Sequence, residues 1–212
     1  MTRPRFLAPV VALVGAMLLA SACSGGDSPS AVQGESPYRG MVLAQPRTMP
    51  DAVLTDTSGQ PYDLRERAEG RLTLLYVGYT HCPDICPAHM ANIAAAFERL
   101  PAEVTRDIDV VFVTSDPERD TPDVLRSWLD AFDPAFVGLT SAQDNLDAVQ
   151  RALGMPVAVR QDLGNGNYAV NHAANVVAFT SDGEGHLEFP AGSTPDDLAH
   201  DLPLLVKGWK NP

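Results

Sequence analysis

The sequence predicts an α/β sandwich in which helices flank a mixed central sheet. Strand-like and helix-like segments alternate from about Met49 onward, which is typical of layered α/β domains. Two continuous β-favouring runs, 72–79 (LTLLYVGY) and 108–114 (IDVVFVT), indicate strands buried on both faces. Together these patterns place the two runs at the centre of the sheet.

The remaining elements follow from periodicity and turn chemistry. A short apolar strand is expected over 52–55, closed by the turn at Ser58-Gly59. A helix is expected over 87–100, because apolar side chains recur there at helical spacing and Pro87 suits a first turn. The later segments predict a helix capped by Thr121 before Pro122, a short strand over 136–139, and a helix capped by Ser141 that runs to about Leu153. They also predict strands over 175–180 and 187–190 joined at Asp182-Gly183, and a last helix capped by Thr194.

The N-terminus has the pattern of an export signal. Arg3 and Arg5 precede an apolar run that is too short to span a membrane comfortably. The run ends in Leu-Ala-Ser-Ala-Cys, which resembles a bacterial lipobox, so Cys23 is the predicted site of lipid attachment. A cleaved secretory signal, with Cys23 incidental, is the alternative.

Three regions are therefore expected. Residues 1–22 form the lipoprotein signal peptide, and residues 23–47, rich in Ser, Gly, Pro and Gln, form a flexible tether. Residues 48–212 form the folded domain, held at the outer face of the bacterial cytoplasmic membrane.

The composition argues against a nucleic-acid-binding protein and against a small domain stabilised by disulfides. A net charge of −12 and a pI near 4.6 repel phosphate backbones, so nucleic acid is not an expected partner. Three cysteines are too few for a small domain held together by disulfides.

The most informative segment is 78–87 (GYTHCPDICP), at the junction of a predicted strand and helix. Three residues separate Cys82 from Cys86 there, and helix N-terminal N–H groups favour a thiolate at such a position. The pair has three interpretations: a structural disulfide, a redox-active dithiol, or part of a metal site. Redox motifs of the thioredoxin type separate their cysteines by two residues, so three is a departure.

Two thiolates seldom complete a metal site, so a third ligand is expected among the five histidines. His186 and His200 lie in polar surroundings and are predicted to face solvent. His89, three residues after Cys86, is a possible ligand but fits a surface position better, and His81 adjoins the pair too closely to chelate with it. From composition alone, His172 is better explained as a structural histidine.

Three segments together resemble the Sco/SenC family. The segment 79–87 (YTHCPDICP) is similar to that family's CPDxCP motif, and 114–121 (TSDPERDT) to its DPxRDT segment. The segment 168–172 (YAVNH) resembles the one bearing the family's distal copper-binding histidine. The matches occur in family order across roughly residues 50–208.

The resemblance implies a thioredoxin-like fold that binds one copper ion, as Cu(I) or Cu(II), through Cys82, Cys86 and His172. It also implies a part in assembling the CuA centre of cytochrome c oxidase, by copper delivery, by thiol reduction, or by both. The implied partners are the CuA-bearing oxidase subunit and either another copper chaperone or a thiol reductase. A copper-sensing or storage lipoprotein is a further class, and the lack of a Met-rich or His-rich tract argues against storage.

One residue departs from the family pattern. Asn171 stands immediately before His172, where the family usually has Asp. A carboxylate there could orient the imidazole. Asn171 is therefore expected to alter the copper affinity or redox balance of an otherwise intact site.

Overall fold

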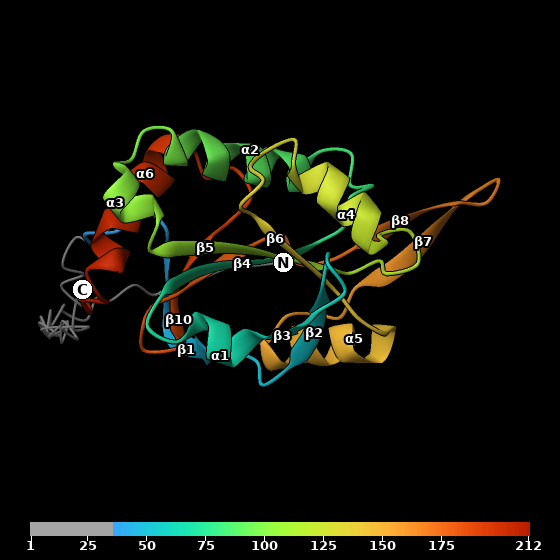
Figure 1. Cartoon of the computed structure of the whole chain (residues 1–212), viewed down its shortest axis with the longest axis horizontal. Helices are drawn as coiled ribbons and strands as arrows, with labels where there is room; N and C mark the ends of the chain where they lie inside the picture. The colour runs from blue at the N-terminus through green and yellow to red at the C-terminus, as the bar shows by residue number, and fades with distance from the viewer. Residues whose placement is uncertain (1–35) are drawn as a thin grey trace, which may run out of the picture. The chain divides into compact units, whose positions relative to one another are not determined.

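The computed structural model describes residues 36–212, which form a mixed eight-stranded sheet covered by helices (Figure 1). The strand order is β1-β10-β9-β4-β5-β6-β2-β3, and a separate hairpin pairs β7 with β8. No helix within these residues is long and apolar enough to cross a membrane. The strands are β1 (Met41–Thr48), β2 (Val53–Asp56), β3 (Pro61–Asp63), β4 (Leu72–Gly78), β5 (Ile108–Thr114), β6 (Val137–Thr140), β7 (Val159–Gly164), β8 (Asn167–Asn171), β9 (Val176–Phe179) and β10 (Glu184–Phe189), and the helices are α1 (Leu64–Ala68), α2 (Ile85–Phe97), α3 (Ala102–Thr105), α4 (Pro122–Leu129), α5 (Gln143–Ala152) and α6 (Pro195–Val206).

The two continuous apolar runs form the central strands, as predicted. β4 and β5 pair in parallel over seven residues, from Leu72 opposite Ile108 to Gly78 opposite Thr114. Each strand is buried on both faces, because helices cover the two sides of the sheet (Figure 1). The carboxyl ends of β4 and β5 therefore meet at the same edge, where the cysteine loop begins.

The core lies in two layers, one on each side of the sheet. Tyr76 and Phe112 point into the layer beneath α2, α4 and α6, whereas Val77 and Val113 point into the layer against α1 and α5. This alternation along each strand is what a sheet covered on both faces requires. It also decides which side chains of β4 can reach the cysteines, because Cys86 belongs to the first layer.

The predicted caps are confirmed for two helices and wrong for a third. Thr121 accepts from the Val124 N–H at the start of α4, and Thr194 forms a capping box with Asp197 at the start of α6. In contrast, Ala142 rather than Ser141 occupies the cap position of α5. The Ser141 hydroxyl instead accepts a hydrogen bond from the Asn145 side chain.

The folded region begins before the predicted boundary at residue 48. β1 starts at Met41 and pairs antiparallel with β10, with a register shift between Val42 and Arg47. Pro46 lies within that irregular stretch of an edge strand, where a missing N–H is tolerated. The signal peptide, Cys23 and the rest of the tether up to residue 35 lie outside the described residues.

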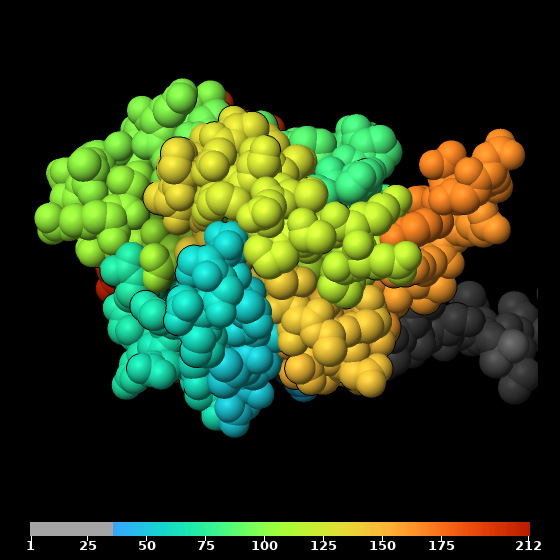
Figure 2. Space-filling view, turned by 45° about the vertical axis from the view of Figure 1, so that its right-hand side comes forward, coloured from blue at the N-terminus to red at the C-terminus, as the bar shows by residue number. Residues whose placement is uncertain are grey.

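The hairpin β7–β8 was not predicted as strands. Its turn lies at 164–167 (GNGN), where Asn165 has a φ of 56°. In Figure 2 the hairpin, coloured orange, projects from the body of the domain. All six residues of β7 are exposed, so they lack the apolar alternation that identifies a strand.

Candidate metal centre

The cysteine loop leaves the end of β4 and enters α2. Cys82 lies in the loop and is partly exposed, whereas Cys86 is the second residue of α2 and is fully buried. The Cys86 N–H donates to the Cys82 sulfur at 3.4 Å. The short loop and the helix start thus turn both sulfurs to one side, and no disulfide joins them in the structure.

His172 reaches the same place from the other half of the chain. It directly follows β8, and the connection to β9 returns the chain to β4, where Val176 pairs with Tyr76. The imidazole Nε2 lies 3.5 Å from the Cys86 sulfur. The rings of Tyr79 and Tyr76 flank the imidazole at 5.6 and 6.2 Å between centroids.

One donor atom each from Cys82, Cys86 and His172 lies within 4.8 Å of the other two. Thiolate and imidazole donors hold a metal ion at about 2.0–2.3 Å, so donors on one ion lie within roughly 4.6 Å of each other. The three groups therefore have nearly the spacing that a shared ion requires. Two sulfurs and one imidazole form a soft donor set that suits copper.

The orientation of His172 is fixed by a backbone carbonyl. Its Nδ1 lies 2.7 Å from the Ala173 oxygen, which places the proton on Nδ1 and leaves the Nε2 lone pair facing the sulfurs. Asn171, by contrast, directs its amide to Gln161 across the hairpin at 3.4 Å. The Asn171 amide thus bonds to the hairpin and the imidazole bonds to Ala173, while the expectation that Asn171 alters copper affinity or redox balance stays a prediction.

The two thiols have opposite protonation behaviour. The hydrogen bond between the two cysteine side chains lowers the pKa of Cys82 to about 4, and the backbone N–H groups of Asp84 and Cys86 add to this effect. The same hydrogen bond, together with burial, raises the pKa of Cys86. The metal-free reduced site therefore holds one thiolate, on Cys82, and one thiol, on Cys86.

A buried tyrosine completes the surroundings of Cys86. The hydroxyl of Tyr76 donates to the Cys86 sulfur at 3.2 Å, and burial raises the pKa of this tyrosine. Sequence reasoning placed Tyr76 in a buried strand and gave it no further part. Tyr76 could have been identified from the sequence, because the hydroxyl of a tyrosine buried in a strand requires a hydrogen-bond partner.

The other histidines lie outside the metal cluster. His89 is buried rather than on the surface, and its Nε2 lies 2.8 Å from the Ala174 oxygen. His186 is buried against Trp209, with parallel rings 4.6 Å apart, so the prediction that it faces solvent is wrong. His200 is exposed, as predicted, and His81 is half exposed beside Thr80.

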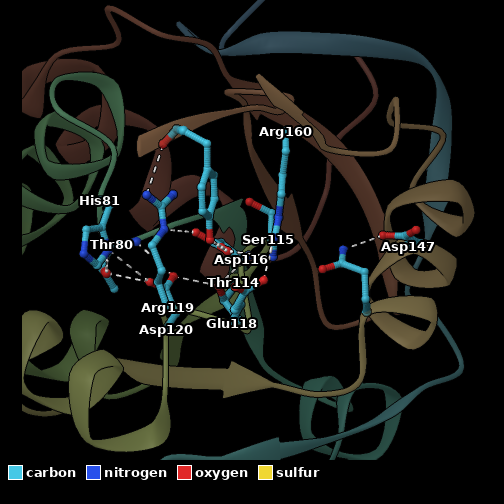
Figure 3. Close-up of polar contacts among 12 residues, drawn as sticks. Thr80, His81, Thr114, Ser115, Asp116, Glu118, Arg119, Asp120, Asp147 and Arg160 are labelled. Atoms are coloured by element: carbon cyan, nitrogen blue, oxygen red, sulfur yellow. Dashed lines mark hydrogen bonds and ion pairs between the residues drawn. The ribbon is translucent and has the colours of Figure 1, made fainter. Parts of the chain in front are cut away.

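The DPERDT segment anchors the start of the cysteine loop (Figure 3). Asp120 is fully buried and accepts from the Thr80 N–H at 2.9 Å and from the Thr80 hydroxyl at 2.6 Å. It also accepts from the Thr114 hydroxyl at 2.7 Å. Because Thr80 precedes Cys82 by two residues, this carboxylate fixes the loop at the point where it leaves the sheet.

Comparison with known proteins agrees with this geometry. The family model described as SCO1/SenC matches residues 43–207. The "Putative copper-binding protein" of Stutzerimonas stutzeri is 35% identical over 168 residues, covering 78% of this chain and 80% of that protein. "Protein SCO2, mitochondrial" of Saccharomyces cerevisiae is 33% identical over 145 residues, covering 68% of this chain but only 47% of the yeast protein.

Solved structures share the fold. Apo Sco1 of Thermus thermophilus superposes with a TM-score of 0.71 at 30% identity, covering 79% of this chain and 96% of that one. ScoI of Bradyrhizobium japonicum, solved with copper bound, gives a TM-score of 0.68 at 28% identity, covering 74% of this chain and 99% of that one. The mixed sheet flanked by helices is thus the predicted thioredoxin-like fold, and the chain belongs to the SCO1/SenC family.

Proposed function

We propose that this protein binds one copper ion through Cys82, Cys86 and His172, and delivers it to, or prepares, the CuA site of cytochrome c oxidase. The observation that carries the proposal is the convergence of these three donor atoms within 4.8 Å, from segments 86 residues apart in the chain. A copper-bound structure of a relative and a relative named as copper-binding support the choice of metal.

The donor set also determines the oxidation states. Two thiolates favour Cu(I), and the imidazole allows the site to accept Cu(II) as well. The thiolate is the ligand, so disulfide formation between Cys82 and Cys86 and copper binding exclude each other. Copper loading is therefore under redox control.

Exposure of the ligands favours transfer from one side. Cys86 is buried beneath Tyr76, whereas Cys82 and His172 are partly exposed. A thiolate of the CuA-bearing subunit can approach the ion beside Cys82 and displace that ligand first. Another copper chaperone would deliver the ion to this site from the same exposed side, beside Cys82.

Anaerobic titration of the reduced protein with Cu(I), against a competing chelator, tests the copper proposal. We expect one equivalent to bind tightly to the wild type and the affinity to fall in His172→Ala, because one of three ligands is lost. His200→Ala is the matched control, since His200 is exposed and outside the cluster. Equal weak binding by wild type and His172→Ala would overturn the proposal.

The second candidate function is thiol–disulfide exchange on the cysteines of the oxidase subunit. The low pKa of Cys82 and the adjacent buried thiol favour it. The Cys82 thiolate attacks one acceptor sulfur and releases the other as a thiolate. The Cys86 sulfur, after losing its proton, then attacks Cys82 and releases the second acceptor thiolate. The acceptor disulfide is reduced, and this protein ends with a Cys82–Cys86 disulfide that a thiol reductase must reduce again.

The two functions differ in their need for the imidazole. Reduction of an oxidised CuA-subunit domain by His172→Ala at the wild-type rate, with copper binding lost, would favour exchange as the main function. Copper delivery would be favoured if His172→Ala no longer loads copper and the wild type shows no measurable thiol–disulfide exchange.

We also propose that Cys23 carries the lipid anchor and holds the domain at the outer face of the cytoplasmic membrane. Cys23→Ser should abolish incorporation of a labelled fatty acid and release the protein from the membrane fraction. Unchanged labelling of this variant would overturn the assignment.

A further inference from the structure

The hairpin that delivers His172 contributes few buried side chains of its own. β7 is exposed throughout, and within β8 only Val170 is buried. A lone two-stranded hairpin is marginally stable in water. The position of β8, and of His172 directly after it, therefore depends on contacts between the hairpin and the rest of the domain.

Arg119, in the DPERDT segment, makes the most extensive of these contacts. Its Nε donates to the carboxylate of Asp116, and its Nη1 donates to the backbone oxygen of Tyr168 in β8 at 3.1 Å. The guanidinium carbon lies 3.6 Å from the centroid of the Tyr168 ring and 5.7 Å from that of Tyr79. One side chain thus contacts the segment after β5, the hairpin strand, and the residue at the start of the cysteine loop.

Asp116 holds the same tyrosine from its other end. It is fully buried and accepts from the Tyr168 hydroxyl at 2.9 Å. Arg160 of β7 adds a longer contact with Asp116 at 3.4 Å and an ion pair with the exposed Glu118 (Figure 3). Tyr168 is therefore fixed at its backbone, its ring and its hydroxyl, four residues before His172.

The ring of Tyr79 extends this arrangement to the ligand itself. It lies perpendicular to the His172 imidazole, while its ring also contacts Arg119. Arg119 thus contacts both β8, which leads to His172, and the aromatic ring beside the imidazole.

We propose that Arg119 is a positioning residue that holds the β7–β8 hairpin so that the Nε2 of His172 faces the two sulfurs. The inference rests on the copper site proposed above and assigns Arg119 no direct contact with copper. An outer residue that orients a metal ligand typically changes the affinity for the metal by about 10–100-fold. Because Arg119 acts through His172, its effect requires His172 to be present.

Arg126 provides a matched control within the same chain. Its Nε also donates to a carboxylate, Asp130 at 2.8 Å, and its Nη1 also donates to a backbone oxygen, Phe136 at 2.8 Å. Asp130 follows the last residue of α4 and Phe136 precedes β6, so neither partner belongs to the hairpin. Arg126→Gln thus removes the same kinds of bond without releasing β8.

The test is a double-mutant cycle for copper affinity. We expect Arg119→Gln to weaken Cu(II) and Cu(I) binding about tenfold in the wild-type background and to have no further effect in His172→Ala. Arg119→Lys should restore part of the loss, because it keeps the charge opposite Asp116 but not the planar contact with Tyr168. Arg126→Gln should bind copper as the wild type does.

A second measurement needs no metal. Amide hydrogen exchange of β7 and β8 in the apo protein should quicken in Arg119→Gln and stay unchanged in Arg126→Gln, with β4 and β5 protected in both. This measurement separates the inference from the proposed function, since it holds even if the wild type does not bind copper. Wild-type copper affinity in Arg119→Gln, an equal loss in both His172 backgrounds, or unchanged exchange in the hairpin would each overturn the inference.

Discussion

At the scale of single residues, Tyr76 distinguishes Cys86 from Cys82. Among the hydrogen bonds of residues 36–212, Cys86 receives one from the buried Tyr76 hydroxyl, at 3.2 Å, and Cys82 receives none from a buried hydroxyl. A hydrogen bond donated to a ligating sulfur stabilises its negative charge, and this charge is larger when the metal is Cu(I) than when it is Cu(II). Tyr76 is therefore expected to favour the reduced ion.

Tyr76→Phe tests this expectation with almost no change of shape. We expect Cu(I) affinity to fall by about ten- to hundredfold, since a hydrogen bond to a charged group contributes about 1.5–3 kcal/mol. Competition with a Cu(I) chelator measures the change, and the sulfur-to-Cu(II) absorption band should move to lower energy. The control is Tyr62→Phe, because Tyr62 is a buried tyrosine in the core layer on the opposite side of the sheet. An unchanged Cu(I) affinity and an unmoved band would show that the hydroxyl does not act on the metal.

The low pKa of Cys82 predicts the pH dependence of its reactivity. Alkylation of the reduced apo protein by iodoacetamide should keep a constant rate from pH 8 to 5 and decline only as the pH falls through about 4. In the unfolded protein the alkylation rate should already decline once the pH drops below 9.0, the ordinary pKa of the thiol. Cys82→Ser should abolish this reactivity, and a native profile that follows the unfolded one would contradict the assignment.

The same shift has a consequence for stability. The folded state lowers the pKa of Cys82, so its thiolate stabilises the fold fully above pH 9. This contribution shrinks as the pH falls and is absent below about pH 4. The stability difference between wild type and Cys82→Ser in denaturant should therefore be larger at pH 8 than at pH 5.

At the scale of elements, the end of β4 controls how closely the strand packs against α2. A Cβ on Gly78 would lie 2.9 Å from the Cys86 sulfur and 3.0 Å from Cε2 of Phe112. Gly78→Ala should cost about 1–3 kcal/mol of stability through overpacking and should also weaken Cu(I) binding, because the sulfur must move. Gly138→Ala, whose Cβ would meet Leu129 at 2.7 Å, should cost stability while copper binding persists. Equal copper affinity in both variants would show that the sulfur relaxes freely.

The elements also show what the sequence could predict. β4 and β5 were predictable because burial on both faces leaves a continuous apolar run. β7 and β1 were not, because β7 is exposed throughout and β1 is an edge strand interrupted at Pro46. Local pattern carries no signal where a strand is stabilised by partners distant in the chain.

The same distinction applies to the site. Cys82 and Cys86 were identifiable from spacing and chain position alone. His172 needed family resemblance, because the nearer of the two cysteines, Cys86, lies 86 residues away in the sequence. Tyr76 and Arg119 were missed as contributors, since nothing local indicates that a strand tyrosine meets a thiol or that an arginine meets a distant strand.

At the scale of the whole molecule, the three proposed ligands join parts of the chain that lie far apart, so copper binding at this site is expected to stabilise the fold. A ligand present at about 1,000 times its Kd adds about 4 kcal/mol of stability, which for a domain of this size raises the Tm by roughly 8–16 °C. Thermal unfolding of the reduced protein, followed anaerobically by circular dichroism with and without buffered Cu(I), measures the shift. His172→Ala should show a smaller shift and Cys86→Ser almost none, whereas His200→Ala should shift as the wild type does. A wild-type shift that survives in Cys86→Ser would mean that copper binds elsewhere on this acidic chain, because the proposed site joins α2 to the end of β8 through Cys86.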